Sequence, residues 1–545
     1  MSRDYWYGAN AWRLWLFLGV LWFATMPWRP LLDPDEGRYA EIPREMWVSG
    51  DWLTPHLDGL KYFEKPPLQY WATAAVYTVF GSSEWTSRLW AATLGFLCLP
   101  LVYGFSRRIG QSRDTALIAA LLLAINPYFV ITGHVNLLDQ AFSFFLVASV
   151  FSFALAQRET RNSDQELSWM LCAWAALALA VLSKGIVAIV LTGMTLAIHM
   201  TLTRDVSVLR RMHFLTGLPL FAAIAAPWFW LVQQRNPEFA GFFFVHEHFT
   251  RFLTTVHHRT GAWWYFLAVL FFALTPVLWS IGPAIAQGRQ KPAAVGEFQV
   301  GRFLWIWCIV VLGFFSFSQS KLTPYILPMM PPLALLMAQA VHGDRRARGR
   351  AAIALGVTTL IVGIALLALC WRRSGAVDPG LAGWVMLAAA IGLMPAFVGF
   401  RMAAAESQLT KWVALAAASI IAYQTLIMAY SMVPPGLSAR TLAMQVKPHV
   451  SPKTELFSVG QFHNTLPFYL ERTLQVVSFT GELEFGLDQA GNAAKVDLQR
   501  FRELWDPSLD AIAFIEPALY QKLVEAKLPG RVLANDGRTV AVIRR

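Results

Sequence analysis

The sequence predicts an α-helical polytopic membrane protein that ends in a small C-terminal α/β domain. Three observations predict this fold class. Only 14% of the 545 residues are charged, whereas 56% are hydrophobic and the mean hydropathy is +0.45. Such a composition would leave a water-soluble globule with too little polar surface. Apolar runs long enough to cross a membrane recur along the chain, and the pattern changes after Ser431.

The first apolar run, residues 12–26, is predicted to be an uncleaved membrane-spanning helix. Arg3 and Arg13 precede its uncharged stretch, residues 15–26, as in a signal peptide, but no small-residue cleavage site follows and the next residues are acidic. Residues 31–80 form the first external loop, where we expect interfacial helices. Its last part, residues 66–80, is short and begins with two prolines, so both a span and an interfacial helix are possible.

Twelve further runs bring the expected number of transmembrane helices to about 13, because in lipid only helices satisfy their own backbone groups. Lys and Arg close to span ends mark the cytoplasmic side. If residues 66–80 do not cross, nearly every basic cluster becomes cytoplasmic, the N-terminus lies inside and the C-terminus outside. The twelve runs cover residues 85–105, 115–131, 140–156, 169–182, 186–200, 214–232, 263–281, 303–317, 322–341, 351–370, 384–400 and 412–430.

Two domains follow from this reading: a membrane domain of residues 1–431 and an external α/β domain of residues 432–545. The second contains strand-like runs, "TELFSV", "TLQVVSF" and "AIAFI", and a helical "EPALYQKLVEAK". Close to the end, "NDG" between "RVLA" and "RTVAVI" predicts a hairpin turn.

Acidic residues gather directly after the first run, in "DPDEGRYAEIPREM" from Asp33. A carboxylate at the lipid boundary loses hydration unless it is paired or lines a wet cavity. One alternative is a solvated interfacial helix whose arginines pair with neighbouring acids. The other is a site in which Asp35 is catalytic. Its substrate-binding neighbours would be Asp33, Arg38 and Tyr39.

A second acid, Asp139, lies at the mouth of the fourth run in "GHVNLLDQAF". It could be a first-turn acid that interacts with the helix dipole. The predicted orientation, however, brings it to the same face of the membrane as Asp35 and Glu64, so the three could share a cavity. Glu64 precedes Lys65 and two prolines in "YFEKPPLQYW", where a salt-bridged surface turn is the alternative.

An external loop contains two histidines around an acid, in "FFFVHEHFTRF". His246 and His248 could join Glu64 around a divalent metal ion, because imidazole and carboxylate groups suit such ions. The alternative is an interfacial belt in which these side chains meet lipid headgroups. Cations on the same face could hold a phosphate, although lysines at span ends commonly snorkel to water. These cations are Lys65, Lys184, Arg251 and Lys321.

Taken together, these motifs resemble those of one enzyme family. "LLDPDEGRYAEIPREMWVSGDWLTPHLDGLKYFEKPPLQYW", "NLLDQAF", "LSKG", "EHFTRF" and "SKLTPYILP" are similar to motifs of the bacterial 4-amino-4-deoxy-L-arabinose (undecaprenyl phosphate-aminoarabinose) lipid A transferases. These are GT-C glycosyltransferases related to protein O-mannosyltransferases. The likeness extends from residue 31 to about residue 332, and the first motif is the most specific.

The resemblance implies a GT-C fold in the bacterial inner membrane with the active site facing the periplasm. It implies transfer of 4-amino-4-deoxy-L-arabinose, with inversion, from undecaprenyl phosphate to a lipid A phosphate, a lipopolysaccharide modification that confers polymyxin resistance. No nucleotide cofactor or nucleic-acid partner is expected. The implied roles are catalysis for Asp35 and Asp139, phosphate binding for Lys65, Arg251 and Tyr325, and a possible divalent metal at Glu64 with a loop histidine.

Two alternatives remain at this point. Relatives that transfer other sugars share the first acidic motif, so the acceptor could be a protein hydroxyl or another glycolipid. A lipid or solute transporter is the alternative of another class. Transporters place polar residues near the bilayer midplane, often in repeated halves, whereas the ionisable residues here gather at one face.

Overall fold

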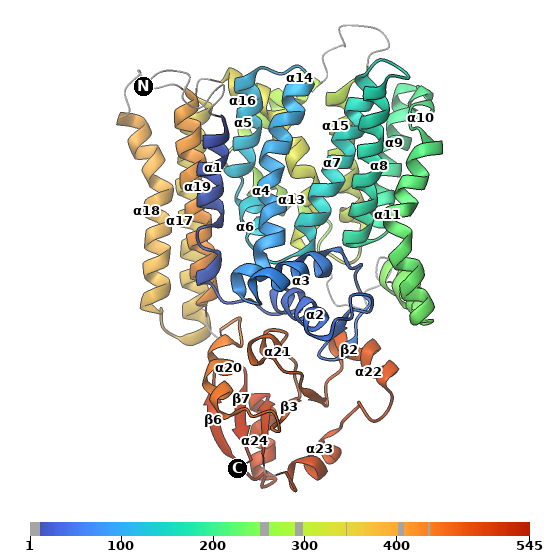
Figure 1. The fold of residues 1–545 in the computed structure, drawn as a ribbon. Coiled ribbons are helices and arrows are strands. Elements are labelled where there is room, and N and C mark those ends of the chain that lie inside the picture. The colour runs from blue at the N-terminus through green and yellow to red at the C-terminus, as the bar shows by residue number, and fades with distance from the viewer. Residues whose placement is uncertain are drawn as a thin grey trace.

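The computed structural model describes residues 11–250, 261–288, 298–344, 346–401, 408–433, 436–508 and 510–544. A bundle of long helices forms the larger part, and an α/β domain is attached to one end of it (Figure 1). The last long helix of the bundle ends at Ser431, and the first helix of the α/β domain begins at Arg440. These two positions flank the predicted domain boundary.

Within the described residues, nine helices are long and apolar enough to cross a membrane. All nine coincide with predicted runs, which confirms a multi-pass membrane protein. They are α4 (Glu84–Arg108), α7 (Leu138–Arg158), α8 (Asp164–Lys184), α11 (Phe214–Arg235), α15 (Val300–Phe317), η5 (Thr323–Met329) continued by α16 (Met330–Gly343), α17 (Ala347–Ser374), α18 (Pro379–Arg401) and α19 (Gln408–Ser431).

Two further runs form bent helix pairs, and two form shorter helices. α5 (Arg113–Ala124) meets α6 (Pro127–Gly133) at 65°, because Pro127 has no N–H with which to continue the first helix and Asn126 caps the second. α13 (Tyr265–Leu274) meets the segment of η4 (Leu278–Ser280) and α14 (Ile281–Gly288) at 103°. Counting each pair as one span gives up to eleven spans. The predicted number of 13 is not confirmed, since α1 (Ala11–Phe23) and α9 (Val187–Thr203) are short.

The first external loop lies across the end of the bundle, between the membrane helices and the α/β domain (Figure 1). It contains α2 (Asp35–Ser49) and α3 (Leu68–Phe80), which pack against each other. With 13 residues, α3 is shorter than a membrane crossing requires, so residues 66–80 form an interfacial helix and not a span. The small strands β1 (His56–Leu57) and β2 (Leu60–Lys61) lie between the two helices.

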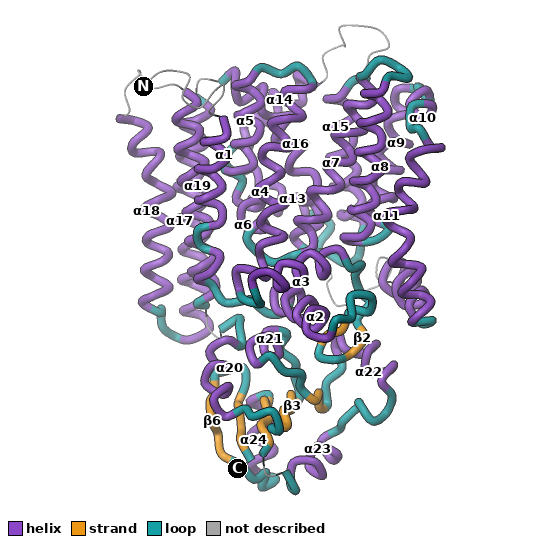
Figure 2. Tube along the Cα trace, viewed as in Figure 1, coloured by secondary structure: helices purple, strands orange, loops and turns teal. Residues whose placement is uncertain are grey.

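The α/β domain contains a five-stranded sheet of order β4-β3-β5-β7-β6. Apart from β1 and β2, all strands of the described chain belong to this sheet (Figure 2). β3 (Glu455–Val459) is parallel to β4 (Gln475–Val477) and β5 (Ala511–Ile515), whereas β7 (Val540–Ile543) is antiparallel to β5 and to β6 (Arg531–Asn535). The predicted strands, the hairpin and the helix α24 (Pro517–Glu525) are therefore present.

The shorter helices complete the chain. Those of the α/β domain flank the sheet, and the π-helix η3 contributes to the site described below. They are η2 (Met26–Trp28), α10 (Ser207–Arg210), η3 (Gly241–Thr250), α20 (Arg440–Val446), η6 (Lys447–His449), α21 (Thr465–Leu470), η7 (Gly481–Leu483), α22 (Glu484–Ala490) and α23 (Leu498–Trp505).

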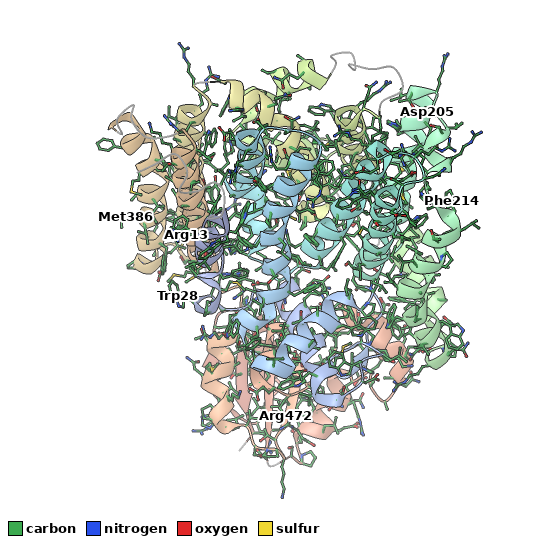
Figure 3. All side chains as sticks on the ribbon, turned by 45° about the horizontal axis from the view of Figure 1, so that its top comes forward. Arg13, Trp28, Asp205, Phe214, Met386 and Arg472 are labelled. Atoms are coloured by element: carbon green, nitrogen blue, oxygen red, sulfur yellow. The ribbon has the colours of Figure 1, made fainter. Side chains whose placement is uncertain are left out.

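Large apolar side chains point outward from the bundle, as a lipid-facing surface requires. Trp28, Phe214 and Met386 lie on its outside (Figure 3) and are 63%, 42% and 66% exposed. In contrast, Trp22 and Trp307 are fully buried between the helices. The bundle is thus apolar both inside and outside, and its buried polar groups stand out from this background.

Candidate active site

A cavity of about 500 Å³ lies where the first external loop meets the ends of α7, α8, α9 and α15. It contains Asp35, Glu64 and Asp139, which come from three separate stretches of the chain. The polar lining residues are Asp35, Arg38, Tyr39, Glu64, Lys65, Asp139, Lys184, Glu247, Ser318, Ser320 and Tyr325. The apolar ones are Leu137, Leu138, Ile186, Val187, Val190, Phe314, Phe315, Leu322 and Pro324.

Asp35 begins α2 and pairs with Arg38 one turn later. Arg38 also pairs with Glu482 of the α/β domain and donates to the Tyr62 hydroxyl at 3.0 Å. Burial alone would lower the pKa of Arg38, but Glu482 and other neighbouring acidic groups raise it well above its ordinary value. Arg38 therefore stays charged and fixes the position of the half-exposed Asp35 carboxylate.

Asp139 lies in the first turn of α7 and pairs with Lys184, the last residue of α8. The Lys184 ammonium is 4.3 Å from the centre of the Tyr325 ring and 5.4 Å from that of Phe142. Lys184 thus points into the cavity and does not snorkel to the membrane surface.

Lys65 connects the first loop to the π-helix η3. Its ammonium lies 3.3 Å from Glu247 and 3.8 Å from Glu64, and it donates to the backbone oxygen of Glu64 at 2.7 Å. Glu247 was not among the predicted site residues, although it lies between His246 and His248, which were. The sequence signal that could have identified Glu247 is an acidic residue within an aromatic external loop.

The predicted metal site is only partly described, through Glu64 and His246. Glu64 and Glu247 both face Lys65, and His246 is 3.6 Å from Glu247 and stacks on Phe242. In the parts of the chain that the structure describes, no group of three or more His, Cys, Asp or Glu side chains could hold a metal ion. The metal site at Glu64, His246 and His248 therefore stays a prediction. The side chain of His248 lies outside the described residues, as does Arg251.

Two predicted residues lie outside the cavity. Asp33 accepts from the Thr465 backbone N–H at 2.8 Å and pairs with Arg538 at 3.1 Å, so it binds the α/β domain. Lys321 donates to the backbone oxygens of Ser316 and Ser318 at 2.8 and 2.9 Å and shapes the loop behind the lining residues. Burial lowers the pKa of Lys321.

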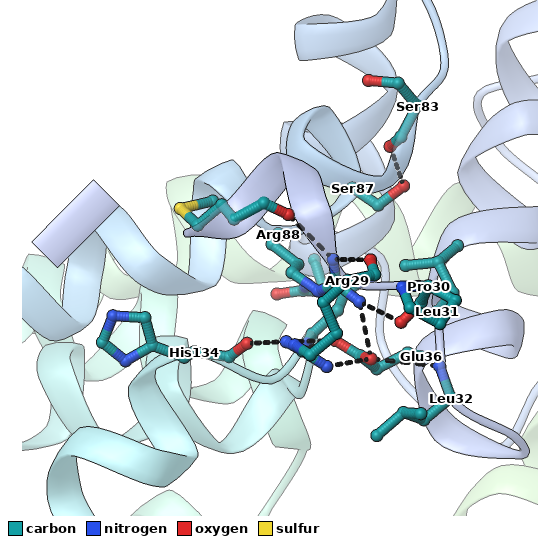
Figure 4. Close-up of polar contacts among 12 residues, drawn as sticks. Arg29, Pro30, Leu31, Leu32, Glu36, Ser83, Ser87, Arg88 and His134 are labelled. Carbon is teal, nitrogen blue, oxygen red and sulfur yellow. Dashed lines mark hydrogen bonds and ion pairs between the residues drawn. The ribbon is translucent and has the colours of Figure 1, made fainter. Parts of the chain in front are cut away.

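A buried charged network supports both acids of the cavity (Figure 4). Glu36 pairs with Arg29 at 2.8 Å and with Arg88 at 2.7 Å, and it accepts from the Asn136 backbone N–H at 3.0 Å. Glu36 is the neighbour of Asp35, and Asn136 precedes Asp139 by three residues. Burial alone would raise the pKa of Glu36, but the two arginines lower it to about 2. The network therefore holds the end of η2 and the starts of α4 and α7 to the start of α2.

Two family models match the chain. The model described as dolichyl-phosphate-mannose-protein mannosyltransferase matches residues 10–243. The model described as aminoarabinose transferase C-terminal domain matches residues 442–544. The first match includes Asp35, Lys65 and Asp139, and the second includes Glu482.

Relatives that share one name are similar to this chain over about two thirds of its length. The undecaprenyl phosphate-alpha-4-amino-4-deoxy-L-arabinose arabinosyl transferase of Aeromonas hydrophila is 32% identical over 69% of this chain and 71% of the relative. The protein of that name from Pseudomonas aeruginosa is 33% identical over 66% of this chain and 64% of the relative.

The fold is similar to that of a solved enzyme along its whole length. The crystal structure of ArnT from Cupriavidus metallidurans bound to undecaprenyl phosphate is 31% identical, has a TM-score of 0.90 and covers 99% of both chains. The apo structure of that protein gives a TM-score of 0.87 with 98% coverage of both chains. Similarity of this extent confirms the predicted fold class. We conclude that the chain belongs to the bacterial aminoarabinose transferase family, related to the protein O-mannosyltransferases.

Proposed function

We propose that this protein transfers 4-amino-4-deoxy-L-arabinose from undecaprenyl phosphate to a phosphate of lipid A. The observation that carries the proposal is the cavity in which Asp35, Asp139 and Lys65 converge. The family membership supplies the sugar and the carrier, since the relatives are named for both. The transfer reduces the negative charge of lipid A and hence the binding of cationic peptides such as polymyxin.

The donor already carries a competent leaving group. An oxygen of the acceptor phosphate attacks the anomeric carbon, the bond from that carbon to the carrier phosphate oxygen breaks, and the electron pair leaves with the carrier phosphate. A single displacement of this kind inverts the anomeric centre. The task of the protein is to orient both substrates and to stabilise the charge on the leaving phosphate.

The cavity offers groups for each part of this task. The Lys65 ammonium and the Tyr325 hydroxyl suit the carrier phosphate, because charged and hydroxyl donors stabilise phosphate oxygens. Asp139 faces the sugar, where it stabilises positive character at the anomeric carbon or the amino group. A lipid A phosphate is already largely ionised near neutral pH, so Asp35 acts by positioning the acceptor and not as an essential base.

The apolar side of the cavity suits the lipid portions of both substrates. Val187 and Val190 of α9 line the cavity together with Phe314 and Phe315 of α15. Burial of methylene groups against such side chains is favourable, and the neighbouring membrane surface gives lateral access. Donor and acceptor would therefore reach the polar end of the cavity without leaving the bilayer.

We place the cavity at the periplasmic face of the bacterial inner membrane. It lies at the end of the bundle that carries the α/β domain. The basic loops, such as "GDRRARGR" from Gly343, favour a cytoplasmic location for the opposite end.

A second candidate acceptor is a protein hydroxyl, which the match to the mannosyltransferase model favours. A hydroxyl must lose its proton during attack, so Asp35 would then act as a general base. Transfer to a hydroxyl peptide and not to lipid A would select this alternative.

The test is a reaction of the purified protein in detergent with undecaprenyl phosphate-aminoarabinose and lipid A. Mass spectrometry should detect lipid A heavier by one aminoarabinose unit. Because detergent leaves no compartments, transfer in this assay also excludes an obligate transporter. Absence of product with both lipid A and the peptide would reject the proposed function.

A further inference from the structure

A short segment of the α/β domain, η7 with α22 (Gly481–Leu483 and Glu484–Ala490), packs against the rim of the cavity. Leu483 and Leu487 are buried in one apolar cluster with Tyr39 and Leu138, both of which line the cavity. Glu482 of the same segment pairs with Arg38, which lines the cavity, so the segment contacts the wall of the site although it belongs to a different domain.

Phe485 of this segment contacts two chain segments at once. The centre of its ring is 4.1 Å from that of Phe242 in η3 and 5.7 Å from that of Phe63 in the first loop. Phe63 is buried and is followed directly by Glu64 and Lys65. Phe242 stacks on His246, which precedes Glu247.

The position of Phe485 is fixed by a close backbone contact. A Cβ atom added to Gly486 would lie 2.8 Å from the Cβ of Leu60 and 2.9 Å from the backbone oxygen of Lys61. Only glycine permits this approach, so α22 lies as near to the first loop as the backbone allows. Phe485 is held with little freedom to move away from Phe63.

The contacts of Phe485 join the two chain segments that carry one ion pair of the site. Lys65 and Glu247 are 182 residues apart in the sequence, yet they pair at 3.3 Å. A pair between distant segments keeps its geometry only if the segments are fixed relative to each other. Phe485 touches Phe63, two residues before Lys65, and Phe242, five residues before Glu247.

We propose that Phe485 is a positioning residue that clamps the first loop to η3 and so presents Lys65 to the carrier phosphate. The inference rests on the proposed function, because it assigns Lys65 to the polyprenyl phosphate. It gives the α/β domain a part in donor binding. The clamp should affect the affinity for the carrier more than the chemical step.

The first test compares Phe485→Ala with the wild-type protein in two measurements. The clamp predicts that undecaprenyl phosphate binds about tenfold more weakly, and that KM for the donor rises by about the same factor with kcat nearly unchanged. Phe485→Trp keeps an aromatic ring and should restore binding to within about threefold of the wild type. Equal binding by Phe485→Ala and the wild type would overturn the proposal.

A control separates the clamp from general loss of stability. Leu523 is buried in a different core cluster of the same domain, with Trp505 and Phe501, so Leu523→Ala destabilises the domain without touching the clamp. It should lower the thermal midpoint and leave KM unchanged. A rise in KM equal to that of Phe485→Ala would overturn the proposal.

A second variant breaks the same contact from the membrane domain. Phe242→Ala should reproduce the rise in KM, and the double variant Phe242→Ala/Phe485→Ala should be little worse than either single variant. Fully additive effects would contradict a shared contact. Failure of the wild-type protein to bind undecaprenyl phosphate or to transfer sugar would instead reject the proposed function itself, so the two failures are distinguishable.

Discussion

Lys184 and Asp139 form an ion pair at the ends of two neighbouring membrane helices, with the Tyr325 ring 4.3 Å from the ammonium. The two residues are 45 positions apart in the sequence, and both line the cavity. The pair holds the Asp139 carboxylate in one orientation within a largely apolar environment. Its geometry therefore connects the packing of α7 and α8 to the reaction.

Removal of the Lys184 charge should impair transfer. Lys184→Met keeps the apolar stem that packs on Phe142 and Tyr325 but leaves the Asp139 carboxylate without its ion-pair partner. We expect kcat to fall by at least about tenfold in the detergent assay. Lys522→Met, at an exposed position of α24, is the control and should have wild-type kinetics. Unchanged kcat in Lys184→Met would show that the pair has no catalytic importance.

The Glu36 network should dominate the stability of the first loop. Glu36→Gln leaves Arg29 and Arg88 buried with only part of their charge compensation, and such losses cost about 3–5 kcal/mol. We expect a much lower thermal midpoint and reduced yield of folded protein.

A surface pair provides the control for this variant. Glu84 pairs with Arg440 at 3.2 Å, and Arg440 is 42% exposed, so Glu84→Gln should cost at most about 1 kcal/mol. Similar midpoints for Glu36→Gln and Glu84→Gln would contradict the role given to the buried network.

Two buried acids beside the α/β domain should make stability fall with rising pH. Burial raises the pKa of Asp58 well above its ordinary value, and burial with the charge of Glu41 raises that of Glu45 well above it. An acid whose pKa is raised by folding contributes stability that is fully present below about pH 4 and is lost as the pH rises toward its native pKa. The contribution of these two acids to the thermal midpoint should therefore decrease as the pH rises above about 4.

Asp58→Asn should reduce this decrease. The Leu474 backbone N–H donates to Asp58 at 2.7 Å, and Asn keeps an acceptor there without ionising. Glu36 does not interfere, because its pKa of about 2 means that its contribution is lost only as the pH falls below the ordinary carboxyl range. An identical pH dependence in the variant and the wild type would refute the assignment to Asp58.

A small residue at Gly37 should be necessary for docking of the α/β domain. A Cβ atom added there would lie 2.5 Å from the Thr465 backbone nitrogen, which belongs to α21. Gly37→Ala should destabilise the protein by about 1–3 kcal/mol, measured as a lower thermal midpoint. Gly193→Ala in α9 is the matched control, since a Cβ atom added to Gly193 would have no neighbouring atom within 4 Å outside its own helix backbone. Equal midpoints for the two variants would contradict the close contact.

Much of this architecture could be predicted from local signals. Hydropathy found the runs that form helices. The distribution of charge in the loops predicted that residues 66–80 form an interfacial helix, and α3 is too short to cross a membrane. The "NDG" turn and the alternating runs predicted the hairpin and the strands of the α/β domain. The same orientation argument brought Asp35, Glu64 and Asp139 to one face, and they line one cavity.

The residues that the sequence did not reveal depend on contacts between distant segments. Arg88 stands inside an apolar run, and only the fold supplies Glu36 as its partner. Asp33 looked like part of the site, but its carboxylate is used by Arg538 and the Thr465 backbone of the α/β domain. The number of 13 spans stays a prediction, because hydropathy marks an apolar run but does not show how long its helix is, as in the short helices α1 and α9.

The most direct test of the account replaces each acid of the cavity and measures transfer by the purified protein. Asp35→Asn and Asp139→Asn keep the size of the side chain and remove its charge. The account predicts that each variant is recovered as folded protein from the membrane and transfers sugar to lipid A at least about a hundredfold more slowly. Wild-type rates in both variants would contradict a reaction carried out between these two carboxylates.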